Sequence, residues 1–338
     1  MASKNCSFGL VCLVILGALM LPVPGLLAQM SQTGSVGAYE AKFVDVNGLR
    51  TRYYEEGAGE AMLLVHGSGY SGTASANTWY RNLPGLAERF HVFAADKLAS
   101  GMTDNPSNDE DFTIRSEVAH MVGFIRSMGI APVHLVGQSR GAGLSFLLAA
   151  NHPELIKTLV LVDSSTAAPP AGDERPNRRR RLFSGCSEDA PQAEQFRCRQ
   201  TALSYSDVAI TDEYVAAAGF MWDQPKARET RERVTPEISR LNAIVTSEMN
   251  HDAYHRILTQ GALAMPVLLY WAKNDPSVLP AQAYSFYNII AESNPRAWLL
   301  FVNRAGHFHY QEKPEEFNRN VINFVTAWDE SELLTLAE

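Results

Sequence analysis

Short apolar runs alternate with segments of helical periodicity along much of the chain. The continuous runs predict strands that are buried on both faces, and they lie at 61–65, 91–95, 133–136 and 158–162. Helical periodicity fills the intervals, at 79–90, 114–125 and 142–150. Before them, alternating residues flank Asn47-Gly48, which is a two-residue hairpin signal. Strands separated by helices imply right-handed crossovers, so we expect an α/β fold with a mostly parallel central sheet and helices on both faces.

This pattern is interrupted over residues 166–261, which contain no buried-strand run and are typical of helices and loops. It resumes with two apolar runs and a final helix, at 266–271, 297–302 and 314–328. We therefore predict a core formed by residues 39–165 and 262–338, with a helical cap, or lid, inserted at 166–261. Such a cap covers a pocket and determines which substrates fit it.

The first 28 residues have the pattern of an export signal. Lys4 gives a weakly basic start, residues 8–21 are uncharged and apolar, and two prolines follow before small residues suited to cleavage. This order is typical of a secretory signal peptide, so we expect a periplasmic or secreted protein whose residues 29–38 form a flexible lead-in. The alternative is an uncleaved anchor, because the uncharged stretch is just long enough to span a bilayer. The leader would then be the membrane attachment of the protein.

The net charge limits the kinds of molecule that the protein is expected to bind, and the cysteines indicate a disulfide. The 338 residues carry a formal net charge of -8, which argues against nucleic acid because phosphate backbones favour basic surfaces. Cys186 and Cys198 lie outside the leader, and one close pair in an exported chain favours a disulfide over the alternative of two free thiols. The run Arg178–Arg181 is interpreted as exposed charge, or as the source of an arginine that binds a substrate carboxylate. The sequence does not indicate the oligomeric state.

The pentapeptide Gly137–Gly141 joins an apolar strand run to a helical run, with Ser139 at its centre. A serine in a G-x-S-x-G turn between strand and helix has strained backbone geometry, and the glycines avoid clashes around it. The turn exposes the hydroxyl at the sheet edge, where the first amides of the helix point toward a bound group. We therefore predict that Ser139 is a nucleophile.

A serine nucleophile needs a base, and the base works best when a carboxylate fixes its tautomer. His307 follows the last apolar run and Asp275 follows the one before it. The chain order Ser139, Asp275, His307 is the order expected for a nucleophile on this kind of turn. Two alternatives stay open: His309 as the base, and Asp163, which also ends a strand at the same edge of the sheet, as the acid.

Five segments together resemble the α/β-hydrolase superfamily, including its carboxylesterases. They are HGSG at 66–69, DKLASGMTD at 96–104, GQSRG at 137–141, YWAKNDPSV around Asp275 and AGHFHYQEKPEEF around His307. The resemblance implies a catalytic triad of Ser139, His307 and Asp275. It also implies an oxyanion hole made by the backbone amides of Ser68 and Arg140, and it implies neither a metal nor a cofactor.

Within the superfamily, HGSG and NTWYRNLPGLAERF at 77–90 resemble capped hydrolases that cleave carbon–carbon bonds in vinylogous diketones from aromatic ring fission. Those enzymes carry Asn before the serine and a bulky apolar residue after it, where this chain has Gln138 and Arg140. They are also expected in the cytoplasm, whereas this chain has an export leader. The sequence therefore favours an exported serine esterase acting on small to medium carboxylic esters. Carbon–carbon bond hydrolysis is the first alternative, and a slow-turnover ligand-binding sensor that keeps the triad is the second.

Overall fold

The computed structural model describes residues 34–335 apart from 38, 71 and 171–179, so the predicted leader at 1–28 lies outside the described residues. One eight-stranded sheet has the order β1-β2-β4-β3-β5-β6-β7-β8. Its strands are β1 (Lys42–Val46), β2 (Leu49–Gly57), β3 (Glu60–Val65), β4 (Phe90–Ala95), β5 (Val133–Gln138), β6 (Ile156–Val162), β7 (Val267–Ala272) and β8 (Ala297–Val302). The β1–β2 and β2–β4 pairs are antiparallel, and the other neighbouring pairs are parallel. The predicted mostly parallel sheet is confirmed.

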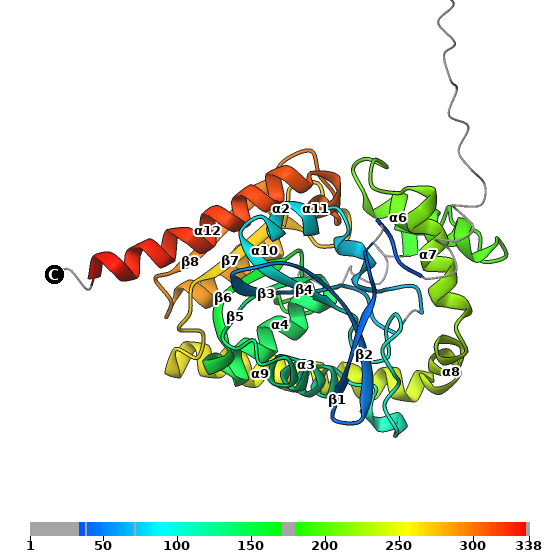
Figure 1. Cartoon of the computed structure of the whole chain (residues 1–338), viewed down its shortest axis with the longest axis horizontal. Helices are drawn as coiled ribbons and strands as arrows, with labels where there is room; N and C mark the ends of the chain where they lie inside the picture. The colour runs from blue at the N-terminus through cyan, green and yellow to red at the C-terminus, as the bar shows by residue number, and fades with distance from the viewer. Residues whose placement is uncertain (1–33, 38, 71, 171–179, 336–338) are drawn as a thin grey trace, which may run out of the picture.

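Helices cover both faces of this sheet (Figure 1). Their bounds are η1 (Ala76–Trp79), α2 (Leu83–Ala87), η2 (Asp109–Asp111), α3 (Ile114–Met128), α4 (Arg140–Asn151), η3 (Pro153–Leu155), α6 (Gln192–Leu203), α7 (Asp212–Asp223), α8 (Pro225–Arg233), α9 (Pro236–Gln260), α10 (Pro280–Ala291), α11 (His309–Glu312) and α12 (Pro314–Thr335). One core layer joins the sheet to α3, α4, α9 and α10, and the other joins it to α2 and α12.

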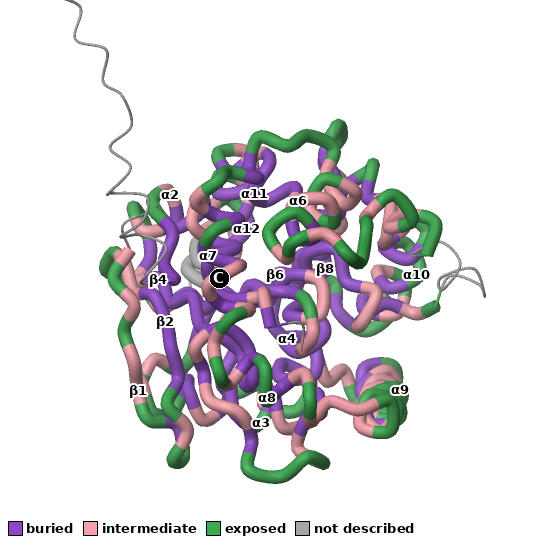
Figure 2. The backbone as a smooth tube through the Cα atoms, turned by 90° about the vertical axis from the view of Figure 1, so that its right-hand side faces the viewer, coloured by how far each residue is buried: buried purple, intermediate pink, exposed green. Residues whose placement is uncertain are grey.

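The two core layers arise from the alternation of side chains along the strands. Leu63 and Val65 of β3 face the α3–α4 layer, whereas Met62 and Leu64 face the α2–α12 layer. Because both faces are covered, all four side chains are buried, and apolar residues occupy consecutive positions. Figure 2 shows the result: the central strands form the buried interior, whereas exposed residues are concentrated in the outer helices, the loops and the edge strand β1.

Local sequence sets the ends of several elements. Asn47 and Gly48 have φ angles of 54° and 85°, which gives the predicted tight hairpin between β1 and β2. Of the helix predicted over 79–90, only α2 (Leu83–Ala87) forms within that range; η1 ends at Trp79, and Phe90 already begins β4. Pro84 lies in the first turn of α2, and because proline has no amide hydrogen it suits the start of a new helix and not the middle of a longer one.

The segment between β6 and β7 contains α6, α7, α8 and α9, and its boundaries as a cap stay a prediction. The predicted disulfide between Cys186 and Cys198 is present, with 5.7 Å between the two Cα atoms. Phe196 of α6 and Tyr214 of α7 belong to a small separate apolar cluster that also includes Val36 and is packed against Tyr80. By contrast, Val245, Ala253 and Ile257 of α9 pack into the main core, so this long helix is attached to the α3–α4 layer.

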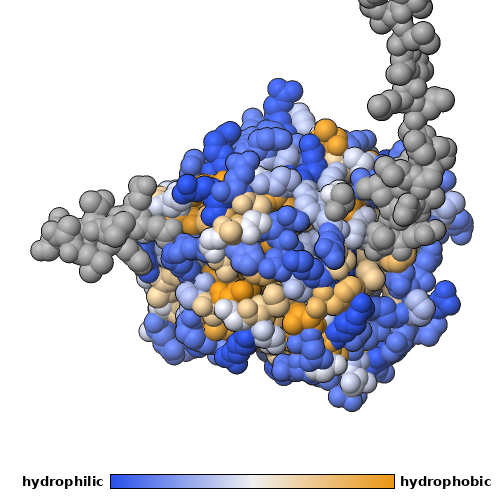
Figure 3. Space-filling view, viewed as in Figure 1, coloured by the Kyte–Doolittle hydropathy of each residue, from blue (hydrophilic) through white to orange (hydrophobic). Residues whose placement is uncertain are grey.

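The outer surface is mainly hydrophilic, and in Figure 3 the apolar side chains on the visible face form separate small patches. Large exposed apolar residues include Ile244 and Leu258 of α9. Among the helices of the described part, none combines the length and apolar character required to cross a membrane.

Candidate active site

Ser139 lies at a sharp turn between the end of β5 and the start of α4. Its φ and ψ are 52° and -119°, a conformation that is strained for a residue with a side chain. A Cβ atom on Gly141 would collide with the backbone carbonyl oxygens of Val65 and His66, and one on Gly137 would lie 2.5 Å from the carbonyl oxygen of Gly141. Both glycines are therefore required by close backbone packing around the serine, as the G-x-S-x-G spacing predicts.

His307 and Asp275 are in direct contact. Nδ1 of His307 lies 2.6 Å from Oδ2 of Asp275, and both side chains are buried. The other carboxylate oxygen of Asp275 accepts hydrogen bonds from the backbone amides of Ser277, at 2.7 Å, and Val278, at 2.9 Å. Burial alone would raise the pKa of Asp275, but the attraction of His307 and these hydrogen bonds outweigh it and hold the pKa below its usual range. Asp275 is therefore a carboxylate at neutral pH.

The serine turn and the histidine loop are joined by Gln138, the residue before Ser139. Its side-chain Nε2 donates to the backbone carbonyl oxygen of His307 at 3.2 Å. Because β5, β7 and β8 run parallel, their carboxyl ends bring Ser139, Asp275 and His307 to one edge of the sheet. The arrangement has the parts of a nucleophile–base–acid relay, and the catalytic roles of these three residues stay a prediction.

Glu312 fixes the histidine loop and was not singled out from the sequence. Oε1 of Glu312 accepts from the amide of Gly306 at 2.9 Å, and Oε2 accepts from the amides of Tyr205, at 3.1 Å, and Ser206, at 2.9 Å. The amide of His307 donates to the carbonyl oxygen of Leu203 at 2.9 Å. The loop that carries His307 is thus bonded to the last residue of α6 and to the chain that follows it. In the sequence, the only signal for Glu312 is its place within the AGHFHYQEKPEEF segment.

The alternative acid, Asp163, lies close to this pair but has a different partner. Its Oδ1 accepts from the amide of Ala272 at 2.9 Å, and its Oδ2 lies 3.3 Å from Nε2 of His309. Burial and the nearby charge of Asp275 raise the pKa of Asp163 well above its usual range. Burial lowers the pKa of His309 to about 3. Burial thus disfavours the charged forms of both Asp163 and His309, whereas Asp275 is held in its charged form beside His307, which favours Asp275 and His307 as acid and base.

Polar atoms of Asp163, Asp275 and His307 all lie within 4.8 Å of one another, a spacing that a metal ion also requires. Nδ1 of His307 and Oδ2 of Asp275 face each other in a hydrogen bond, which occupies the atoms that would bind such an ion. The arrangement therefore fits a proton relay better than a metal site.

Ser68 and Arg140 supply the backbone amides of the predicted oxyanion hole, and that role stays a prediction. Ser68 has a φ of 62°, in the left-handed region, and its carbonyl oxygen accepts from Nζ of Lys97 at 2.6 Å. A Cβ atom on the neighbouring Gly67 would lie 3.0 Å from Cβ of Ser139, so this loop approaches the serine closely. Arg140 directly follows the serine and begins α4.

A buried charge cluster lies beside this loop and was also not found from the sequence. Glu117 of α3 is within 3.5 Å of Nζ of Lys97 and accepts from Nη2 of Arg140 at 2.8 Å. Burial lowers the pKa of Lys97 to about 8. Burial would raise the pKa of Glu117, but Arg140 and Lys97 hold it below its usual range. Its sequence signal is a glutamate three residues after Ile114, on the apolar face of the predicted helix.

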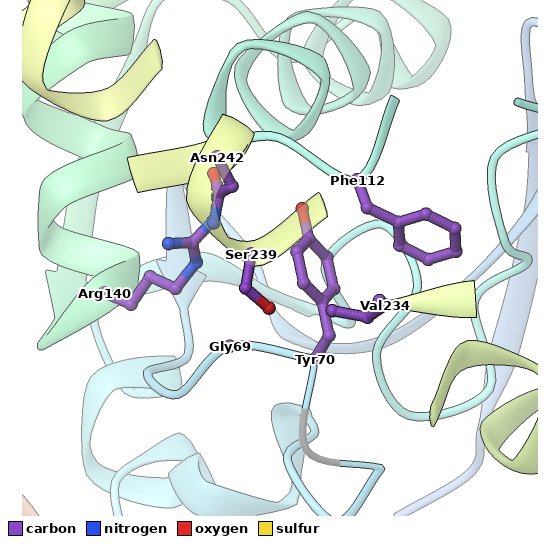
Figure 4. A pocket seen from close by; sticks show the side chains of 7 residues that line it. All are labelled: Gly69, Tyr70, Phe112, Arg140, Val234, Ser239 and Asn242. Carbon is purple, nitrogen blue, oxygen red and sulfur yellow. Dashed lines mark hydrogen bonds between the residues drawn. The ribbon is translucent and has the colours of Figure 1, made fainter. Parts of the chain in front are cut away.

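Two adjoining cavities open beside the serine turn. The first has a volume of about 290 Å³ and lies between Gly69, Tyr70 and α9 (Figure 4). The second has a volume of about 480 Å³ and extends along α9 toward Tyr254. Arg140, Ser239 and Asn242 line both cavities. Ser139 and His307 are not among the residues that line these two cavities, and Arg140, the residue after Ser139, connects the cavities to the serine turn.

Residues 60–314 match the model of the alpha/beta hydrolase fold family, so the chain belongs to that family. Hydrolase activity is supported by this match and by the relatives that the chain resembles.

Several relatives that match most of the chain are named as hydrolases of dienoic acids. A 2-hydroxy-6-oxo-6-(2'-aminophenyl)hexa-2,4-dienoic acid hydrolase of Metapseudomonas resinovorans is 27% identical over 310 residues, which are 88% of this chain and 95% of the relative. A 2-hydroxy-6-oxononadienedioate/2-hydroxy-6-oxononatrienedioate hydrolase of Burkholderia vietnamiensis is 26% identical over 82% of this chain and 91% of the relative. The solved structure of a meta-cleavage product hydrolase from Pseudomonas fluorescens IP01 matches with a TM-score of 0.65 and 24% identity, covering 85% of this chain and 97% of that one.

Proposed function

We propose that the chain is a serine hydrolase that cleaves the bond next to a carbonyl carbon in a dienoic acid with a 2-hydroxy-6-oxo pattern. Ser139 attacks the carbonyl, and His307 takes the hydroxyl proton while Asp275 holds its Nδ1–H. The observation that carries this proposal is the 2.6 Å contact between buried His307 and Asp275, beside the serine turn. The substrate class is taken from the names of relatives that match most of the chain.

In this scheme the 2-hydroxy group first ketonises, and its proton moves to the carbon beside the 6-oxo group. The bond between that carbon and the attacked carbonyl carbon then breaks, and its electron pair is delocalised over the enone fragment. His307, now protonated, returns the proton to that fragment, and an acyl group stays on the Ser139 oxygen. His307 then removes a proton from water, which attacks the acyl group; the bond to the Ser139 oxygen breaks, His307 returns the proton to that oxygen, and a carboxylic acid is released. The amides of Ser68 and Arg140 would stabilise the negative charge on the carbonyl oxygen in both steps.

Ester hydrolysis, the activity favoured by the sequence, is the second candidate. The same nucleophile and base cleave an ester, in which the leaving group is an alcohol. Gln138 and Arg140 support this candidate, because they flank Ser139 where a ring-fission hydrolase is expected to carry Asn and a bulky apolar residue. Export also stays a proposal: the disulfide between Cys186 and Cys198 supports it, since such bonds persist in oxidising compartments.

The decisive experiment compares kcat/KM for two substrates, the aminophenyl hexadienoic acid of the Metapseudomonas relative and p-nitrophenyl butyrate. We expect the acid to be cleaved with the higher kcat/KM, and Ser139→Ala to abolish turnover of both. Ser145→Ala is the matched control, because the Ser145 hydroxyl is buried in α4 without a hydrogen-bond partner in the described part of the chain. Turnover that persists in Ser139→Ala would contradict the proposed nucleophile. A preference for the ester would make esterase activity the better assignment.

A further inference from the structure

The buried cluster beside the nucleophile contains one more positive charge than negative charges. Lys97 and Arg140 both pair with Glu117, and the side chains of Lys97 and Glu117 are fully buried. Arg140 approaches one carboxylate oxygen of Glu117 with Nε, at 3.1 Å, and with Nη2, at 2.8 Å. Two cations therefore share one anion, and the cluster has a net charge of +1.

No neighbouring acid compensates this charge within the described residues. The nearest buried carboxylate in sequence, Asp96, is paired with Arg52, and both side chains have no solvent exposure. His66, whose Nε2 accepts from the Lys97 amide, is neutral because burial lowers its pKa to about 3. A buried charge without a partner is unfavourable, so the arrangement favours an anion at its accessible side.

Arg140 is the accessible member of the cluster. Its side chain is 14% exposed, whereas those of Lys97 and Glu117 are 0% exposed. Figure 4 shows its guanidinium directed toward Asn242 of α9, and Nη2 lies 3.3 Å from Oδ1 of Asn242. The guanidinium thus lines the cavity of about 290 Å³ together with Ser239 of α9. This volume is at the lower end of the range for small-ligand pockets and suits a short acid.

We propose that Arg140 binds a carboxylate group of the substrate in this cavity, and that Ser239 and Asn242 complete the carboxylate site. The proposal rests on the proposed function, since it requires Ser139 to be the nucleophile. A planar guanidinium matches a carboxylate in shape and charge, so Arg140 selects for substrates that carry an acid group within a short chain of the reacting carbonyl. The exposed Arg180 and Arg181, the described part of the Arg178–Arg181 run, are not among the residues that line the two cavities.

The test uses two p-nitrophenyl esters of the same shape, the monoester of adipic acid and its adipamate, in which a neutral amide replaces the carboxylate. The measured quantity is the ratio of kcat/KM for the anion to kcat/KM for the amide, after subtraction of the uncatalysed rate. We expect a ratio of about 10 or more in the wild-type protein, from one charge-assisted contact. The ratio should fall at least about 10-fold in Ser239→Asp, which places a negative charge in the cavity.

Ser285→Asp is the matched control, because it adds the same charge on the exposed face of α10, outside both cavities, and should leave the ratio unchanged. Arg140→Gln should reduce the ratio as well, and Arg140→Lys should give an intermediate value. If Arg140→Gln does not fold, as shown by circular dichroism, Ser239→Asp decides the question. A wild-type ratio near 1, or a ratio that Ser239→Asp leaves unchanged, would overturn the carboxylate site. Turnover of both esters by Ser139→Ala would instead overturn the proposed function.

Discussion

Replacing Asp275 by asparagine distinguishes the two carboxylates near His307. One oxygen of Asp275 accepts from the amides of Ser277 and Val278, so the asparagine carbonyl must stay there and its NH₂ group must face His307. Nδ1 of His307 then becomes an acceptor, and Nε2 carries the proton. In that tautomer the imidazole does not accept the proton of the serine hydroxyl.

The expected loss follows from the charge that is removed. When His307 takes a proton, its attraction to a carboxylate about 4 Å away at an effective dielectric constant of about 20 is about 4 kcal/mol. This energy corresponds to about 10³ in rate, and the wrong tautomer adds to the loss, so kcat should fall by about 10³ to 10⁴. The change should appear in kcat more than in KM, because the interaction strengthens only as the transition state forms.

Asp163→Asn is the matched control for this experiment. Burial and the charge of Asp275 raise the pKa of Asp163 well above its usual range and so disfavour its charged form; an amide of the same shape should therefore keep kcat within about 10-fold. Both variants are assayed with p-nitrophenyl butyrate and the dienoic acid, and thermal unfolding is measured to verify that each folds. A loss below about 10-fold in Asp275→Asn, together with a loss above about 10³-fold in Asp163→Asn, would refute Asp275 as the acid.

Three further outcomes are expected. Gly306→Ala should lower kcat by about 100-fold, because the new Cβ would lie 2.5 Å from the carbonyl oxygen of Leu203 and displace His307. An unchanged kcat would contradict the role of Gly306 in positioning His307. Replacing Cys186 and Cys198 together by serine should lower the free energy of unfolding by about 3 kcal/mol, as measured by urea titration, and mass spectrometry of the non-reduced protein should show the bond. Burial lowers the pKa of His120 to about 4, so as the pH falls from 6.5 toward 4 the unfolded chain binds a proton there that the folded chain does not. The wild-type protein should therefore lose stability more steeply than His120→Gln over that window, by about 1.4 kcal/mol per pH unit, and equal slopes would exclude this effect.

The central sheet and the serine turn were predictable because local patterns determine them. Buried strands such as β3 require apolar residues at consecutive positions, and the turn at Ser139 requires glycines where the backbone of β3 approaches. The hairpin at Asn47-Gly48 is a similar case, since two residues with positive φ favour this turn. In each case the pattern that determines the structure lies within a few consecutive residues. At the serine turn, the glycines themselves indicate that another part of the backbone packs closely there.

Features that depend on distant contacts could not be predicted. Asp163 and Asp275 both follow strands that end at the same edge of the sheet. Only the hydrogen bond between Asp275 and His307 distinguishes Asp275 as the candidate acid. Likewise, Glu117 is polar within an apolar helix face, and its two cationic partners are 20 and 23 residues away along the chain. The attachment of α9 to the α3–α4 layer also depends on long-range packing.

Gln138 has a consequence for directed evolution of this chain. Its amide nitrogen holds the His307 carbonyl, and its Oε1 occupies the space that a Cβ on Gly67 would need. An asparagine at position 138 is one methylene shorter and would not span the same gap. Libraries that vary position 138 alone would therefore return mostly inactive clones, whereas libraries that randomise positions 67 and 138 jointly would sample compatible combinations.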